Sequence, residues 1–249
     1  MVVACVSRSI RGKPRMIEPP AIRILSAGAP ITGVRNCAEA NATASGQPFE
    51  IERATSPLIK ERVSSGTAEA EIVVAPLAAM EEFASAGHVE PQTVSAIGSI
   101  TLGVVIREGA REPDISSVES FTRSLLEADS VIYNQASSGQ YIAAMLDKLE
   151  LTDKLAAKTI VVANGAAVME RLVEDARLDD IGFGQITEIR RHDHLGTRLL
   201  GPLPKAIGRE TPYAVGLLTS ASRPEIARRL VDLMVSSAGK RIFVASGVV

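Results

Sequence analysis

Short apolar segments alternate with longer amphipathic segments along this chain from Ala21 onward. The short segments are rich in aliphatic and β-branched residues, which favour strands, and the longer ones repeat apolar residues at helical spacing. Strands are expected at 21–25, 49–53, 71–74, 99–106, 130–133, 159–162, 180–183 and 213–218. Helices are expected at 34–43, 58–64, 77–85, 118–128, 141–149, 166–175 and 224–236. This alternation predicts an α/β protein whose largely parallel strands are covered by helices on both faces.

The pattern changes at two places. The segment 87–98 is rich in small and polar residues, and after Phe183 the spacing loosens through the basic segment 188–209. We interpret both as crossings between two lobes, because each interrupts the regular succession of strand and helix. The predicted division is a flexible arm at 1–20, lobe 1 at 21–97 and 206–249, and lobe 2 at 98–205. One continuous doubly wound sheet is the alternative, since periodicity alone does not separate the two arrangements.

Two of the predicted turns from strand to helix carry serine hydroxyls. Thr55-Ser56 precedes one helical pattern, and Ser137-Ser138-Gly139 precedes another. A helix that starts at such a turn directs unpaired backbone N–H groups and the positive end of its dipole at the space above the sheet. Both turns follow the carboxyl ends of strands, where ligands of open α/β sheets bind. The turns therefore predict a cleft for a small anion, although simple helix capping uses the same residues.

The composition argues against several classes of partner. The formal net charge is -2 and the 27 Lys and Arg are scattered, so no nucleic-acid footprint is expected. No apolar run approaches the roughly 20 residues of a membrane span. Aromatic residues make up 3% of the chain with no Trp, which argues against sugars and nucleobases, since these are commonly stacked on rings. A small anion fits these properties better, and we expect the protein to be a monomer.

Neither a metal site nor a disulfide framework is expected. Cys5 and Cys37 are too few for either. His192 and His194 would lie on one face of a strand, as zinc ligands can, but they follow the pair Arg190-Arg191. We interpret this segment as a solvated basic loop, because the arginines would repel a cation.

The N-terminal segment bears on location. Val2-Val3-Ala4-Cys5 is similar to the end of a bacterial lipoprotein cleavage box. The basic segment 11–20 stands where an export signal would have its apolar stretch of roughly 7 to 15 residues. No complete export signal is therefore expected in this sequence.

The motifs that carry a family resemblance are Ile22–Ala29, Thr55-Ser56, Gly66–Ala75, Ser137-Ser138-Gly139, Ala163-Asn164-Gly165 and Ile181–Gln185. In this order the chain resembles the molybdate-type periplasmic substrate-binding proteins, a family that also includes aconitate isomerase, over nearly its whole length. The resemblance implies a type 2 periplasmic-binding-protein fold with two α/β lobes, each a mostly parallel sheet flanked by helices. It also implies an oxyanion held by neutral donors without metal or cofactor, an ABC permease as partner, and a periplasmic location. The incomplete export signal leaves a cytoplasmic location open.

The resemblance implies the following ligand-binding residues: Ser26, Ala29, Thr55, Ser56, Ala75, Pro76, Ser137, Ser138, Gly139, Gly165 and Gln185. Two positions depart from the family, because Ala29 stands where a serine is usual and Gln185 where a tyrosine tends to be. An amide both donates and accepts hydrogen bonds, so a carboxylic acid or an amide fits better than a dianion that only accepts. Arg53 and Lys60 are candidate contacts for a carboxylate, with solvated surface charge as the simpler interpretation.

Three functions fit these observations. We place a solute-binding protein for ABC-type uptake of an oxyanion or carboxylate first. The alternative is an enzyme similar to aconitate isomerase, which moves a proton and a double bond within a tricarboxylate. Its general base would be one of Glu71, Lys60 and Tyr141, which the sequence does not rank. A ligand-sensing module without transport or catalysis is the third function, and no catalytic residue is assigned.

Overall fold

The computed structural model describes residues 19–174 and 179–249. Its strands are β1 Ile22–Ala27, β2 Phe49–Ala54, β3 Ile72–Pro76, β4 Ser95–Arg107, β5 Ser130–Asn134, β6 Thr159–Val162, β7 Asp180–Gln185, β8 Thr197–Pro202 and β9 Glu210–Leu217. Its α-helices are α1 Ile31–Ser45, α2 Ser56–Ser64, α3 Leu77–Ser85, α4 Val118–Glu127, α5 Ser137–Lys148, α6 Thr152–Leu155, α7 Gly165–Glu174, α8 Ile186–Arg191, α9 Pro224–Val235 and α10 Ser237–Ala245. Most of the predicted N-terminal arm, with Cys5, lies outside the described residues, as does residue 175, the end of a predicted helix.

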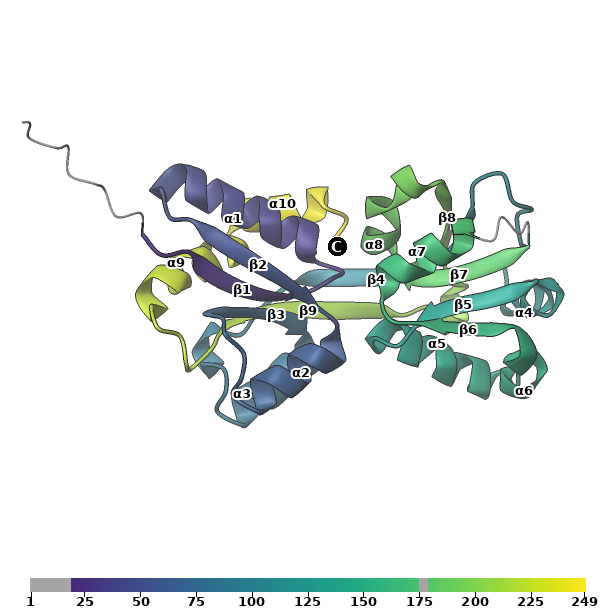
Figure 1. Ribbon diagram of the computed structural model, residues 1–249, viewed down its shortest axis with the longest axis horizontal. Coiled ribbons are helices and arrows are strands. Elements are labelled where there is room, and N and C mark those ends of the chain that lie inside the picture. The colour runs from purple at the N-terminus through teal and green to yellow at the C-terminus, as the bar shows by residue number, and fades with distance from the viewer. Residues whose placement is uncertain (1–18, 175–178) are drawn as a thin grey trace, which may run out of the picture.

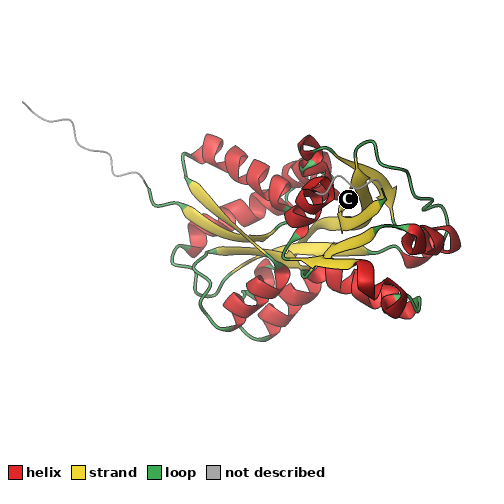
Figure 2. Cartoon of the chain, turned by 45° about the vertical axis from the view of Figure 1, so that its right-hand side comes forward, coloured by secondary structure: helices red, strands yellow, loops and turns green. Residues whose placement is uncertain are grey.

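The strands form one curled sheet. Nine described strands belong to it, with the hydrogen-bonded order β2-β1-β3-β9-β4-β7-β5-β6 and with β8 paired to β4. Helices cover the sheet above and below (Figures 1 and 2). The predicted α/β class is confirmed.

The structure differs from the sequence-based prediction at several boundaries. The sequence predicts no strand or helix in the segment 188–209, but β8 and most of α8 lie there. β8 is stabilised by pairing with β4, and α8 is stabilised by burying Ile189 in the core. α5 begins at Ser137 rather than at residue 141, because Ser and Gly have low helix propensity and hide its first turn. The helix predicted at 224–236 is confirmed as α9, whereas α10 was not predicted; Ser236 separates the two helices, and its side chain caps α10.

β4 joins the two halves of the sheet. Its residues Ser95–Thr101 pair with β9, whereas Leu102–Val105 pair with β7 and Gly103–Arg107 with β8. On one side β1, β2 and β3 are parallel, and on the other side β5, β6 and β7 are parallel. Figure 1 shows these halves to the left and right, with β4 and β9 between them. The chain returns to the first half between β8 and β9.

The hydrophobic core is divided at the same place. One cluster of buried residues extends along the chain to Ile100 and resumes at Tyr213, whereas the buried members of two other clusters lie between Leu102 and Leu203. Each half therefore buries its own apolar surface. The lobe boundaries predicted near residues 98 and 206 stay a prediction. In the described part of the chain, no helix combines the length and apolarity needed to cross a bilayer.

A buried carboxylate connects three segments of the first half. Glu71, 1% exposed, immediately precedes β3 and accepts hydrogen bonds from the backbone N–H of Arg23 (2.7 Å) and the hydroxyl of Ser222 (2.9 Å). The guanidinium groups of Arg23 and Arg223 lie 3.8 and 3.7 Å from its Oε1. A buried charge persists when it is paired and hydrogen-bonded, so we assign Glu71 a structural role.

Replacing Glu71 by alanine should lower the free energy of unfolding by about 3 kcal/mol, because buried donors lose their acceptor. Chemical denaturation followed by circular dichroism measures this loss. Glu69→Ala is the matched control, since the Glu69 side chain is 88% exposed and lies 3.7 Å from the same Arg23. Its loss should cost less than about 1 kcal/mol. Equal stability of the two variants would contradict the structural role.

Candidate ligand-binding site

A cleft of about 250 Å³ lies where the two halves of the molecule meet. Residues at the carboxyl ends of β1, β2 and β7 line it, together with the first residues of α2, α5 and α7. Gly28 and Arg53 come from the first half, whereas Gln185 and Glu188 come from the second. Ligands of α/β sheets bind at this edge, because helix starts and loops converge there. The cleft is therefore the candidate site.

The N-termini of α2 and α5 face each other across this cleft. Ser56 and Ser137 are the first residues of these helices, and Ser137 Oγ donates a hydrogen bond to Ser56 Oγ at 3.4 Å. The preceding residues, Thr55 and Ala136, make no side-chain capping hydrogen bond. The first-turn N–H groups and positive dipole ends of both helices are therefore available to an anion beside them.

Most of the residues predicted to bind a ligand line the cleft: Ala29, Thr55, Ser56, Ser137, Ser138, Gly165 and Gln185. Ser26, Ala75 and Pro76 do not line it. Ser26 is fully buried, and its hydroxyl donates to the Ala27 carbonyl at 3.0 Å. Ala75 and Pro76 pair with β9 in the sheet. These three residues support the strands beneath the cleft.

Ser138 and Gly139 hold α5 against the end of β5. The side chains of Ser138 and Asn134 are hydrogen-bonded, with Asn134 Nδ2 to Ser138 Oγ at 3.1 Å, and Asn134 Oδ1 also accepts from the Ala136 N–H at 2.8 Å. Gly139 does not line the cleft, and a Cβ added there would lie 1.5 Å from the Asn134 carbonyl oxygen. The absence of a side chain at Gly139 therefore lets α5 begin close to β5, which places Ser137 at the cleft.

Gln185 brings an unpaired amide to the cleft. It ends β7 and is 3% exposed, and neither Oε1 nor Nε2 completes a hydrogen bond within the described residues. Tyr213 also lines the cleft, and burial, followed by the charge of Glu188, raises the pKa of its hydroxyl. An unpaired buried polar group costs about 1 to 3 kcal/mol. A ligand that both donates and accepts at Gln185 would remove this cost.

Glu188 is a carboxylate in the cleft wall that the sequence analysis does not identify. Its Oε1 accepts a hydrogen bond from Arg191 Nη2 at 3.2 Å, and Arg191 Nη1 donates to the Gly28 carbonyl of the other half at 2.9 Å. The basic composition around α8 hides this residue. Glu188 could have been identified from its position, because it lies one turn after a strand whose carboxyl end reaches the predicted cleft.

The three residues predicted as candidate bases lie outside the cleft. Glu71 belongs to the buried network at the amino end of β3, whereas the cleft lies at the carboxyl ends of strands. Lys60 forms an ion pair with Glu82 of α3. Tyr141 donates its hydroxyl to a backbone carbonyl that precedes β9, at 3.1 Å. Arg53, the other charged candidate, does line the cleft.

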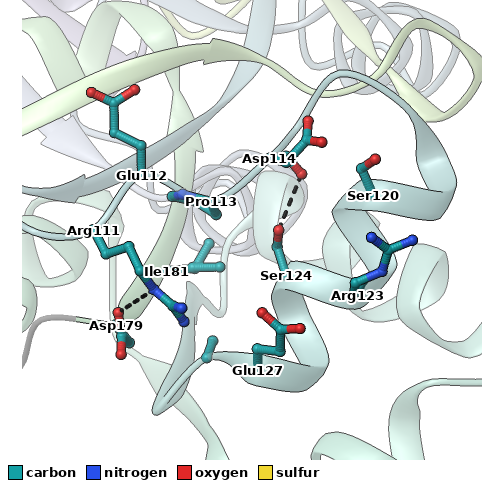
Figure 3. Close-up of a pocket in the computed structure, with 11 residues that line it drawn as sticks. Arg111, Glu112, Pro113, Asp114, Ser120, Arg123, Ser124, Glu127, Asp179 and Ile181 are labelled. Carbon is teal, nitrogen blue, oxygen red and sulfur yellow. Dashed lines mark hydrogen bonds and ion pairs between the residues drawn. The ribbon is translucent and has the colours of Figure 1, made fainter.

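A second hollow of about 310 Å³ lies beside α4 and the start of β7. Figure 3 shows Arg111 paired with Asp179 at 3.0 Å and the Ser124 hydroxyl donating to the backbone carbonyl of Asp114 at 3.1 Å. Four carboxylates line this hollow against two guanidinium groups: Glu112, Asp114, Glu127 and Asp179 against Arg111 and Arg123. The excess of negative charge disfavours an anion, so this hollow is not the candidate site.

The described residues contain no group of three His, Cys, Asp or Glu arranged to hold a metal ion. His192 and His194 lie in the helical turns after α8 with their rings stacked 6.2 Å apart, rather than on one face of a strand. Cys37 is buried in α1, and burial raises the pKa of its thiol to about 11. The thiol is therefore protonated at neutral pH and unreactive.

Comparison with known proteins shows what this chain is similar to. A family model described as bacterial extracellular solute-binding protein matches residues 22–249. A curated relative, aconitate isomerase from a Pseudomonas species, is 25% identical over 235 residues, which cover 91% of this chain and 86% of the relative.

Solved structures share the fold. The periplasmic molybdate-binding protein of Azotobacter vinelandii has a TM-score of 0.71 at 16% identity, covering 92% of this chain and 98% of that one. The sulfate-binding protein SubI of Mycobacterium tuberculosis H37Rv has a TM-score of 0.74 at 13% identity, covering 92% and 86%. Identities this low show the fold alone. The periplasmic-binding-protein-like fold predicted from the sequence is confirmed.

Replacing Gly139 by alanine should destabilise the protein by about 3 kcal/mol, because a Cβ cannot fit against the Asn134 carbonyl without moving the backbone. Thermal unfolding measures this effect. Gly208→Ala is the control, since a Cβ at Gly208 meets its nearest atoms at 3.6 Å, an ordinary contact. The control should unfold like the wild-type protein. A Gly139→Ala variant with wild-type stability would contradict the close approach.

Proposed function

Because the chain belongs to the bacterial extracellular solute-binding protein family, we propose that it binds a small polycarboxylate in the cleft beside the N-termini of α2 and α5. The observation that carries this proposal is the facing pair of Ser56 and Ser137, whose hydroxyl oxygens lie 3.4 Å apart at two helix starts without side-chain caps. Two helix N-termini that converge on one place concentrate positive potential there, which favours an anion.

Several features favour a carboxylate over a tetrahedral oxyanion. Ala29 offers no hydroxyl, and Gln185 brings a donor and an acceptor together. A fully ionised oxyanion only accepts hydrogen bonds. It could therefore donate none to the amide oxygen of Gln185 or to the carboxylate of Glu188. Arg53 supplies a fork of donors that matches a carboxylate. The ligand class that fits is an acid with more than one carboxylate and at least one proton-bearing group.

The role we assign to this binding is uptake. The halves have separate cores and are joined at β4 and at residues 203–209, so they can close over a ligand as rigid bodies. Thr187 Oγ1 donates to the Ala29 carbonyl at 2.8 Å, which is a contact between the halves. Closure makes a surface that an ABC permease could distinguish from the open form. Uptake requires a periplasmic location, and a monomer is expected.

Ser56→Ala and Ser137→Ala should each weaken binding of a polycarboxylate by about 10- to 100-fold, because each removes a hydrogen bond to a charged ligand. Isothermal titration calorimetry with citrate, tricarballylate and both aconitate isomers measures this, with molybdate and sulfate as oxyanion probes. Ser64→Ala, at the far end of α2, is the control and should bind as the wild-type protein does. Unchanged affinity in both cleft variants would contradict the site, and binding of the oxyanions alone would contradict the ligand class.

Isomerisation of the bound ligand is the second candidate function. The similarity to aconitate isomerase spans 91% of this chain, so it is not confined to one half of the cleft. Aconitate carries more than one carboxylate, and it meets the requirement for a proton-bearing group when one of its carboxyl groups is protonated. A carrier and an isomerase would share the anion-binding helix starts and differ in whether a group in the cleft moves a proton.

Incubation of the protein with cis-aconitate should distinguish the two functions. For an isomerase, proton NMR should show trans-aconitate accumulating in proportion to protein concentration, because the shift of a proton moves the double bond. The matched control is the same incubation with heat-unfolded protein. An unchanged spectrum from protein that binds cis-aconitate in calorimetry would remove the second candidate and leave the carrier.

A further inference from the structure

The geometry points to Glu188 as a general base that removes a proton from a carbon next to a carboxylate of the bound ligand. This inference rests on the proposed binding of a polycarboxylate in the cleft. It goes beyond that binding, because it assigns proton transfer and a residue to it. Three observations on this chain support it: the position of the carboxylate, the way it is held, and the absence of a competing base among the described cleft residues.

Glu188 is placed by two glycines. It lies in α8, directly after β7, and is 8% exposed where it lines the cleft. A Cβ on Gly165 would lie 1.9 Å from Glu188 Oε2, and one on Gly28 would lie 3.2 Å from Oε1. A side chain at Gly165 would therefore occupy the space of the carboxylate. The two glycines, one from each half, leave room for Glu188 at the point where the halves meet.

The two oxygens of Glu188 have different surroundings. Oε1 accepts from Arg191 Nη2 at 3.2 Å, and Arg191 is itself held by the Gly28 carbonyl through Nη1 at 2.9 Å. Oε2 makes no hydrogen bond within residues 19–174 and 179–249. One oxygen is thus fixed and the other is left to a ligand. A base held in this way can meet a C–H bond without first breaking a hydrogen bond of its own.

No other described residue of the cleft is a comparable base. Glu188 is the one carboxylate among the described residues that line it. Burial, reinforced by Glu188, raises the pKa of Tyr213, so the phenol stays protonated and can only donate at neutral pH. Serine hydroxyls and the amides of Asn164 and Gln185 are not basic at neutral pH. The guanidinium group of Arg53 donates hydrogen bonds and accepts none.

The proposed step balances without a cofactor. Glu188 Oε2 takes a proton from a CH₂ group that lies between a carboxylate and a C=C bond. The electron pair of that C–H bond forms a new C=C bond, and the pair of the old C=C bond moves to its far carbon. That carbon then takes the proton back from Glu188, so the double bond has shifted and nothing is oxidised or reduced. The negative charge that develops is spread over a carboxylate, which the helix N-termini stabilise.

The test compares wild-type protein with Glu188→Gln, which keeps the shape of the side chain but cannot take the proton. Each protein is mixed with cis-aconitate in D₂O, and proton NMR follows trans-aconitate formation and deuterium uptake at carbon. We expect the rate to fall by about 100- to 10,000-fold in Glu188→Gln, the usual contribution of a general base. Calorimetry on the same samples should show aconitate still bound. Glu170→Gln, the same change on the exposed side of α7, is the control and should retain the wild-type rate.

The outcomes separate the two proposals. Absence of binding by any polycarboxylate would overturn the proposed function. Binding by wild-type protein without isomerisation or deuterium uptake would overturn only the assignment of Glu188. A Glu188→Gln variant with the wild-type rate would overturn it as well. If Glu188→Gln does not fold, Glu188→Asp tests the same point, because it keeps the charge but withdraws the carboxylate by one methylene, and its rate should still fall at least 10-fold.

Discussion

The structure depends on β4, a single strand that belongs to both halves of the sheet. Its hydrogen-bonding partners change from β9 to β7 and β8 between Thr101 and Leu102. The halves therefore share a continuous backbone but no core cluster of buried residues. Strands β1 and β2 on one side and β7 on the other end at the cleft, and the helices that follow them begin there. The position of the cleft is thus a property of the topology, before any side chain contacts a ligand.

Much of this organisation could be predicted from the sequence, because it follows from local patterns. The apolar runs and helical periodicity identify most strands and helices, and the serine-containing turns at 55–56 and 137–139 lie where a strand passes into a helix. β8 could not be found in this way, since Gly201 and Pro202 are unfavourable in strands and the strand is stabilised by pairing with β4 rather than by an alternating pattern of its own. The sequence suggests Ser26 for its hydroxyl, but that side chain is fully buried and donates to the Ala27 carbonyl.

The carboxylates of Glu71 and Glu188 also show that the sequence alone does not predict which side chains reach the cleft. Glu71 lies beside an apolar strand, which makes it prominent in the sequence, but it precedes that strand and so lies at the edge opposite the cleft. Glu188 shortly precedes the basic pair Arg190-Arg191 in the sequence, and only the fold brings it next to Gly28 and Gly165. Glu188 and Gly28 are more than a hundred positions apart in the sequence, so no local pattern predicts that they lie together. Its position before a strand could have excluded Glu71 from the cleft. The orientation of the two carboxylate oxygens of Glu188 could not be predicted from the sequence.

Arg191 holds Glu188 on its own half and a backbone carbonyl, that of Gly28, on the other. Separation of the halves would break the second bond and free the guanidinium to turn toward water. The carboxylate would then lose its fixed orientation at the moment when solvent enters. The base proposed at Glu188 would then act only in the closed cleft, where bulk water cannot quench a carbanion-like intermediate.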